Sequence, residues 1–162
     1  MKSLDLDDYR TVLELAESAG DRCDWRKKTI QYLEAQSRGR PVRHWETSQA
    51  DKLLEIHLHD EAIEEALVVA NEERINPNLL LKLAWKISNE PEKAFPLFQS
   101  VIEYHIMRTN NDAYKYAINL LQEIAGTMQS SQQKQQMTEL LDHLRQEYRA
   151  KRNFIKWLND AF

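Results

Sequence analysis

The chain has 162 residues, of which 42% are hydrophobic and 30% are charged, and its formal net charge is −4. This size suits one domain with one core, and the apolar content excludes a chain that is disordered throughout. The single cysteine, Cys23, excludes an intramolecular disulfide and any zinc site that needs two cysteines of this chain. The sequence has no apolar run of about 18 residues, and its acidic start lacks the apolar core of a signal peptide. We therefore expect a cytoplasmic protein without a membrane span.

Apolar residues recur at helical spacing along the whole chain, and we predict eight helices. The first ends before Gly20, and the second fades before Ser37. Residues 37–45 are basic, contain glycine and proline, and form a predicted loop. The third helix begins near Thr47 or Ser48, either of which can cap it.

The later helix starts are marked by capping residues and prolines. We expect Asp60 to cap the fourth helix and Asn76-Pro77 to begin the fifth. Pro91 suits the first turn of the sixth, and Pro96 predicts either a late start or a kink. Asn110 and the two residues after it begin the seventh.

The eighth helix is the longest of the set. It begins inside the polar run 129–136 and continues to the end of the chain, with a bend expected around Arg149 to Asn153.

Short turns between helices favour helix hairpins that stack side by side. The expected fold is therefore all-α, an α-solenoid of about four antiparallel helix hairpins of tetratricopeptide-like type. We expect one domain over residues 1–162, with an N-terminal hairpin and basic loop in 1–45 and a repeat core in 46–162. Charge is segregated along it, with net charges of −4, +5, −7 and +2 in 1–21, 22–45, 46–92 and 93–162.

Few residues suggest catalysis or metal binding. His57 and His59 are two positions apart, so on one helix they point away from each other and cannot share an ion. The sequence also contains no glycine-rich phosphate loop and no nucleophile motif. We expect no enzymatic activity, no catalytic residue, no metal and no cofactor.

Two groups of residues are candidates for contact with a partner. Residues beside the apolar stripes of the sixth and seventh helices are candidates for a peptide-binding groove: Tyr104, Arg108, Lys115, Tyr116 and Asn119. Basic residues spaced by 4, 3 and 4 share one face of the predicted last helix and are candidates for contact with phosphates or an acidic partner: Arg145, Arg149, Arg152 and Lys156. Trp45, in the basic loop, is a candidate exposed contact residue.

The second half of the chain resembles a known family. The segments LLEIHLHDEAIEEALVVANE, LLLKLAWKISNEPEKAFPLF, NDAYKYAINLLQEIAG and LLDHLRQEYRAKRNFIKWLND, within residues 50–162, resemble the C-terminal helical-repeat region of bacterial SWIM zinc-finger proteins. The elements that carry the resemblance are Pro91-Glu92-Lys93-Ala94, the start Asp112-Ala113-Tyr114 with Ala117, and Leu144-Arg145 with Lys151-Arg152 and Leu158. The family's zinc motif, Cys-x-Cys followed by Cys-x-His, is not in this sequence, so the resemblance implies an interaction scaffold and no metal role.

Three functions remain open from the sequence. The favoured one is a non-enzymatic protein–protein interaction scaffold that binds a protein or peptide segment. The first alternative is a nucleic-acid-associated helical domain that works with a zinc-finger partner or parent chain. The second is a small helical enzyme, which requires a polar pocket with converging titratable groups.

Overall fold

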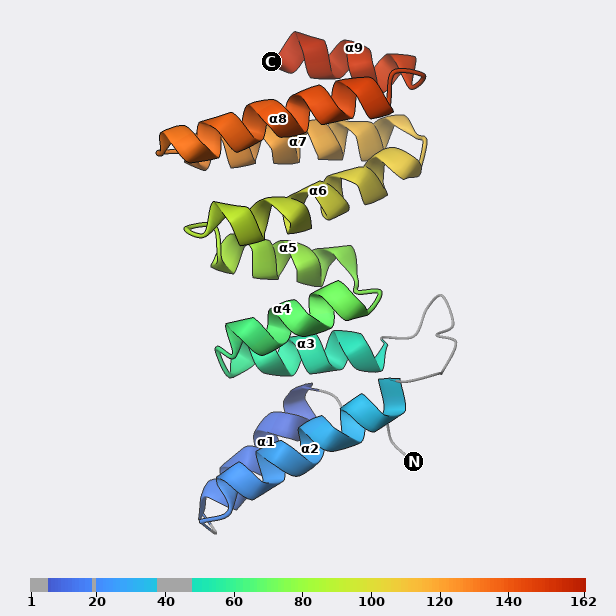
Figure 1. The fold of residues 1–162 in the computed structure, drawn as a ribbon. Helices are drawn as coiled ribbons and strands as arrows, with labels where there is room; N and C mark the ends of the chain where they lie inside the picture. Colours follow the sequence, from blue (N-terminus) through green and yellow to red (C-terminus); the bar gives the residue numbers. More distant parts are fainter. Residues whose placement is uncertain (1–5, 19, 38–47) are drawn as a thin grey trace. The chain divides into compact units, whose positions relative to one another are not determined.

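The computed structural model describes residues 6–18, 20–37 and 48–162. These residues form nine α-helices and no β-strand, which confirms the predicted all-α class (Figure 1). The helices are α1 (Leu6–Ser18), α2 (Arg22–Ser37), α3 (Gln49–His59), α4 (Ile63–Glu72), α5 (Pro77–Lys86), α6 (Pro91–Met107), α7 (Asn111–Thr127), α8 (Ser131–Glu147) and α9 (Arg152–Ala161). Residues 38–47, with most of the predicted basic loop and Trp45, lie outside the described residues.

Contacts between Cα atoms divide the chain into two compact units, Met1–Leu79 and Leu80–Phe162. In the first unit, α1 contacts α2 and α3, α2 contacts α3, and α3 contacts α4. In the second, α6 contacts α7 and α8, and α7 contacts α9. Each unit thus joins helices that are neighbours or next neighbours in the sequence. That residues 1–162 form a single domain stays a prediction.

Three helices begin at side-chain caps, of which Ser48 and Asn110 are predicted from the sequence. Ser48 Oγ accepts a hydrogen bond from the Asp51 N–H at 2.9 Å, and Asp51 Oδ2 accepts one from the Ser48 N–H at 3.1 Å. Ser130 begins α8 with the same reciprocal arrangement, and Asn110 Oδ1 accepts from the Ala113 N–H at 2.8 Å at the start of α7. Caps of this kind satisfy N–H groups that have no partner within the helix, so residue types that can cap a helix mark its start in the sequence.

The start of α5 also agrees with the sequence. Pro77 is its first residue, and Asn76 Oδ1 accepts a hydrogen bond from the Asn78 N–H at 2.9 Å. The buried Asp51 carboxylate accepts the Asn76 N–H at 2.7 Å, so one aspartate fixes both the start of α3 and the chain just before α5.

The prediction that Asp60 caps α4 is wrong. The N-cap of α4 is Ala62, whose side chain makes no capping bond. Asp60 instead follows the last residue of α3 as its C-cap, and its N–H donates to the Ile56 carbonyl. Its carboxylate is committed to residues of α1 and α2, as described below.

Two other differences concern prolines and the chain end. Pro91 begins α6 as expected, and Pro96 lies inside that helix, so it does not delay the start. The predicted long last helix is two helices: α8 ends at Glu147 with Tyr148 as its C-cap, and α9 begins at Arg152. The break lets α9 contact α7.

Each unit has its own apolar core. The largest fully buried side chains of the first unit include Tyr9, Leu33, Leu54 and Ile56. Those of the second unit include Leu83, Ile102, Ile106, Leu121, Ile124, Leu144, Phe154 and Leu158. Burial of this apolar area is the main force that holds each group of helices together.

Candidate functional site

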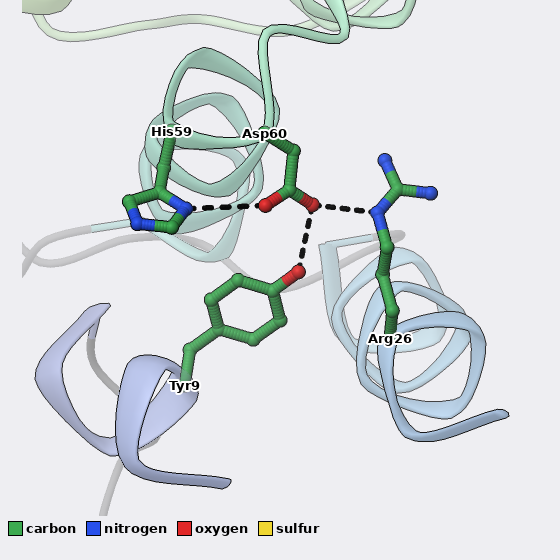
Figure 2. A network of polar contacts seen from close by, with 4 residues as sticks. All are labelled: Tyr9, Arg26, His59 and Asp60. Atoms are coloured by element: carbon green, nitrogen blue, oxygen red, sulfur yellow. Dashed lines mark hydrogen bonds and ion pairs between the residues drawn. The ribbon is translucent and has the colours of Figure 1, made fainter. Parts of the chain in front are cut away.

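The first unit contains a polar cluster around Asp60, which we call the Asp60 cluster: Tyr9, Arg26, His59 and Asp60. The Tyr9 hydroxyl donates to Asp60 Oδ2 at 2.7 Å, and Arg26 Nε donates to the same oxygen at 2.6 Å. His59 Nδ1 lies 3.1 Å from Asp60 Oδ1. Figure 2 shows the carboxylate facing all three side chains, which come from α1, α2 and the end of α3. One carboxylate therefore joins three helices.

The charges of this cluster are mutually stabilised. Burial opposes ionisation of Asp60, but hydrogen bonds from Tyr9, Arg26 and His59 outweigh it and hold the pKa of Asp60 below its usual range. Burial and the hydrogen bond to Asp60 raise the pKa of Tyr9. The hydrogen bond to Asp60 raises the pKa of Arg26. At neutral pH the cluster thus consists of a carboxylate, a guanidinium and a protonated phenol, an arrangement suited to holding helices together rather than to exchanging protons.

Sequence reasoning missed this cluster. Tyr9 and Asp60 are 51 residues apart and Arg26 and Asp60 are 34 apart, so no local spacing connects them. The available signal was Tyr9 itself: a tyrosine in an apolar stripe needs a hydrogen-bond partner for its hydroxyl when it is buried.

His57 and His59 occupy different environments, as their spacing predicts. His57 is 4% exposed, and its Nδ1 has no hydrogen-bond partner. Burial lowers the pKa of His57, so its ring is neutral at pH 7. His59 lines an open depression of about 420 Å³ with Arg10, Leu13, Glu14 and Glu17. Among the residues that the structure describes, no group of three or more His, Cys, Asp and Glu side chains is placed to hold a metal ion.

The structure brings together part of the predicted peptide-binding set. The ring centroids of Tyr104 and His105, neighbours on α6, are 5.3 Å apart and perpendicular. Tyr116, on α7, also contacts His105, with ring centroids 4.1 Å apart. Arg108 lies close enough to lower the pKa of His105, an effect that adds to the larger one of burial.

The remaining members of that set lie apart or make no specific contact. Lys115 is directed toward α9, with Nζ 6.0 Å from the centroid of the Trp157 ring. Asn119 is exposed on α7, three residues after Tyr116. Met107, three residues after Tyr104 on α6, is 64% exposed, and sequence reasoning did not include it. We call the group formed by Tyr104, His105, Met107, Arg108 and Tyr116 the Tyr104 surface.

The basic set at the chain end does not share one helix. Arg145 belongs to α8, Arg149 to the turn, and Arg152 and Lys156 to α9, so the continuous helix that their spacing assumed is interrupted. The Arg145 guanidinium is already engaged, with Nε 3.1 Å from Asn159 Oδ1 and Nη1 3.2 Å from Asp142 Oδ1. The other three are exposed. Their role in binding phosphates or an acidic partner stays a prediction.

Comparisons with known proteins give no relative. No family model matches the chain, and neither the curated proteins nor the solved structures yield a match. Within the described part of the chain, no helix has both the length and the apolar content needed to cross a membrane.

Proposed function

We propose that the chain is a non-enzymatic protein–protein interaction scaffold of α-solenoid, tetratricopeptide-like type that acts in the cytoplasm. The solenoid is supported within each unit by contacts between neighbouring and next-neighbour helices, as stacked helix hairpins require. We also propose the relationship to the helical-repeat region of bacterial SWIM zinc-finger proteins. It rests on the sequence segments described above.

The Tyr104 surface carries this proposal. Tyr104 is 43% exposed and Tyr116 is 40% exposed, and both are positioned by contact with the half-buried His105. Large aromatic side chains that are exposed but positioned lose little entropy on binding and are frequent at the centres of interfaces. With Met107 they form an apolar area beside the Arg108 cation, which suits a protein segment with an apolar side chain followed by a carboxylate.

A comparison of captured proteins tests the proposal. The immobilised wild-type chain and a Tyr104→Ser/Tyr116→Ser variant are exposed to extract of the source cell, and the bound proteins are quantified by mass spectrometry. We expect the variant to lose at least one specific protein by about tenfold or more, since residues at interface centres commonly contribute more than 1.4 kcal/mol. Tyr32→Ser is the matched control, because Tyr32 on α2 is 41% exposed. Equal capture by all three chains contradicts the proposal.

A second candidate, binding to nucleic acid, is favoured by one observation. An open depression of about 360 Å³ in the second unit is lined by Lys151, Arg152 and Asn153 at the start of α9 and by Asn111 at the start of α7. Helix starts and cations both attract phosphate groups. Anisotropy titrations with single- and double-stranded DNA and RNA at about 50 mM salt test it, because phosphate contacts are strongest at low salt. An absence of binding there rejects this candidate.

A further inference from the structure

The second unit contains a groove between α6 and α8 that differs in chemistry from the Tyr104 surface. It measures about 240 Å³ and is lined by Glu92, Phe95, Pro96, Gln99, Gln136, Glu139, Leu140 and His143. We propose that this α6–α8 groove binds an arginine side chain on an extended segment of a protein partner.

The floor of the groove is apolar. Phe95 and Pro96 come from α6, and Leu140 comes from α8. Phe95 is held in place by edge-to-face contact with the buried Phe98, with ring centroids 6.4 Å apart and planes at 86°. A fixed phenyl ring and a proline ring form a surface on which the carbon stem and flat guanidinium of an arginine can lie.

The rim of the groove is negatively charged on both sides. Glu92 projects from α6 and Glu139 from α8. Each accepts a hydrogen bond from a neutral amide: Gln132 Nε2 is 3.1 Å from Glu92 Oε1, and Gln135 Nε2 is 3.0 Å from Glu139 Oε1. Of the lysines and arginines that the structure describes, none lines the groove. A cation from outside therefore meets two carboxylates that both have free acceptor capacity.

The third feature is an acceptor without a donor. Gln136 lines the groove, and its Oε1 atom is buried without a hydrogen-bond partner. A buried acceptor that lacks a bond lowers stability, so a ligand that brings an N–H group recovers that loss when the Gln136 side chain turns its oxygen toward the groove. Two other side chains of the lining are engaged by Glu103, which lies outside it: Gln99 Nε2 donates to Glu103 Oε1 at 2.8 Å, and His143 Nε2 lies 3.1 Å from the same oxygen.

Arginine fits this combination better than lysine. A guanidinium has five N–H donors in one plane and can serve two carboxylates and an amide oxygen together, whereas an ammonium is a compact point charge. The groove is also smaller than the roughly 300–1,000 Å³ typical of small-molecule pockets, which favours one inserted side chain. A peptide segment supplies such a side chain without a larger cavity.

Titration of the ¹⁵N-labelled full chain with the capped peptide Gly-Gly-Arg-Gly-Gly tests the proposal by NMR. We expect saturable shifts at the amides of Phe95, Gln99 and Leu140 and at the Gln136 side-chain amide, with a Kd in the millimolar range, about 1 mM. The same peptide with lysine should bind more weakly, and the peptide with uncharged citrulline should not bind. Equal shifts with the citrulline peptide, equal affinity for lysine, or shifts that never saturate would each overturn the proposal.

Variants locate the site and separate it from the proposed function. Glu92→Gln/Glu139→Gln keeps the shape of the rim and should weaken the arginine peptide by about tenfold or more, since hydrogen bonds to charged groups are the stronger kind. Glu123→Gln/Glu147→Gln removes the same charge from exposed positions outside the groove and should leave affinity unchanged. Tyr104→Ser/Tyr116→Ser should also retain peptide binding, so this inference can fail or stand independently of the Tyr104 surface.

A further variant and a measurement of mass complete the test. Gln136→Met replaces the unpaired amide by an apolar chain of similar length, and we expect higher stability with weaker peptide binding. A variant that keeps full affinity removes Gln136 from the site. Sedimentation that shows a dimer abolished by Glu92→Gln/Glu139→Gln would assign the groove to a second copy of this chain and overturn its assignment to a partner.

Discussion

In each unit, side-chain contacts join a further helix to its neighbours, and the chemistry of these contacts differs between the two units. In the first, the Asp60 carboxylate joins α1 and α2 to the end of α3 through bonds of 2.6 and 2.7 Å. In the second, Phe154 packs α9 against α7 by contact with Tyr114, with ring centroids 5.7 Å apart, and also meets Tyr148 at 6.2 Å. The stabilisation from the Asp60 contacts depends on the charge of one carboxylate and therefore on pH. The stabilisation from the Phe154 contacts comes from buried apolar area.

The largest expected effect is at the aromatic contact. Phe154 is fully buried, so Phe154→Ala should lower the free energy of unfolding of the second unit by about 3–5 kcal/mol. Urea unfolding and amide hydrogen exchange in α7 and α9 measure it. Phe162→Ala is the control, because Phe162 is 42% exposed and its loss should change little. Equal effects of the two substitutions would contradict the role assigned to Phe154.

The next largest effect is at Asp60. Asp60→Asn keeps the shape of the side chain but removes the negative charge that Arg26 and Tyr9 contact. We expect the free energy of unfolding to fall by about 2 kcal/mol, a value that allows for the partial exposure of Arg26. Faster amide exchange in α1, α2 and α3 measures it. Asp24→Asn, at an exposed ion pair with Lys28, should cost less than about 1 kcal/mol.

The same substitution has a pH signature. The pKa of Asp60 lies below its ordinary value of 3.8 in the folded chain. The stabilisation that the ionised Asp60 gives the folded chain is therefore complete above pH 3.8, and it is lost as the pH falls through the folded pKa. The wild type and Asp60→Asn should converge in stability in strong acid, and a constant difference down to the lowest pH would contradict an ionised Asp60.

The two serine caps provide a matched pair between the units. Ser48→Ala and Ser130→Ala should each cost about 1 kcal/mol, because both remove an acceptor from a helix start. Ser48→Ala should cost more, since its partner Asp51 is buried and also holds Asn76. Unfolding midpoints in urea at equal slope measure both, and a larger cost at Ser130 would reverse this ranking.

The smallest expected effect is at His57, and it concerns how the stability of the first unit changes with pH. Burial lowers the pKa of His57 from 6.5, so the unfolded chain binds a proton before the folded chain does, and the first unit loses stability as the pH falls below about 6.5. The charged groups that also act on the pKa of His57 are Glu65 on α4, Arg26 and Glu34 on α2, and Asp60. His57→Gln should flatten the stability curve below about pH 6.5. A curve unchanged by His57→Gln would contradict the assignment.

Local sequence signals made many helix starts predictable, whereas contacts between residues far apart in the sequence could not be predicted. Ser48, Asn76-Pro77 and Asn110 begin helices as the sequence predicts, because a cap and the N–H groups it satisfies lie within three residues. The last long helix was predicted only to begin inside the run 129–136, and Ser130 is its cap. Asp60 was misassigned because the same residue type serves as a cap or as an ion-pair partner, and its partners are far away in the chain. The interruption at Tyr148 was expected only as a bend, since that region has no proline or glycine to mark it.

The candidate surface was predictable only in part. Tyr104 and Tyr116 were found because they flank apolar stripes, but His105 and Met107 were not selected. Lys115 was selected by the same rule and lies against Trp157 instead. Helical spacing specifies a face of one helix, whereas the pairing of faces between α6 and α7 depends on packing that single-helix patterns do not contain.

Photo-crosslinking from the Tyr104 surface tests the central claim most directly. A benzoylphenylalanine placed at position 104 or 116 of the chain in its own cells should, on irradiation, give a covalent adduct with a protein partner at a defined mass. The same group at the exposed Gln146 of α8 should not give that adduct. Identical products from all three positions, or none from 104 and 116, would contradict the account.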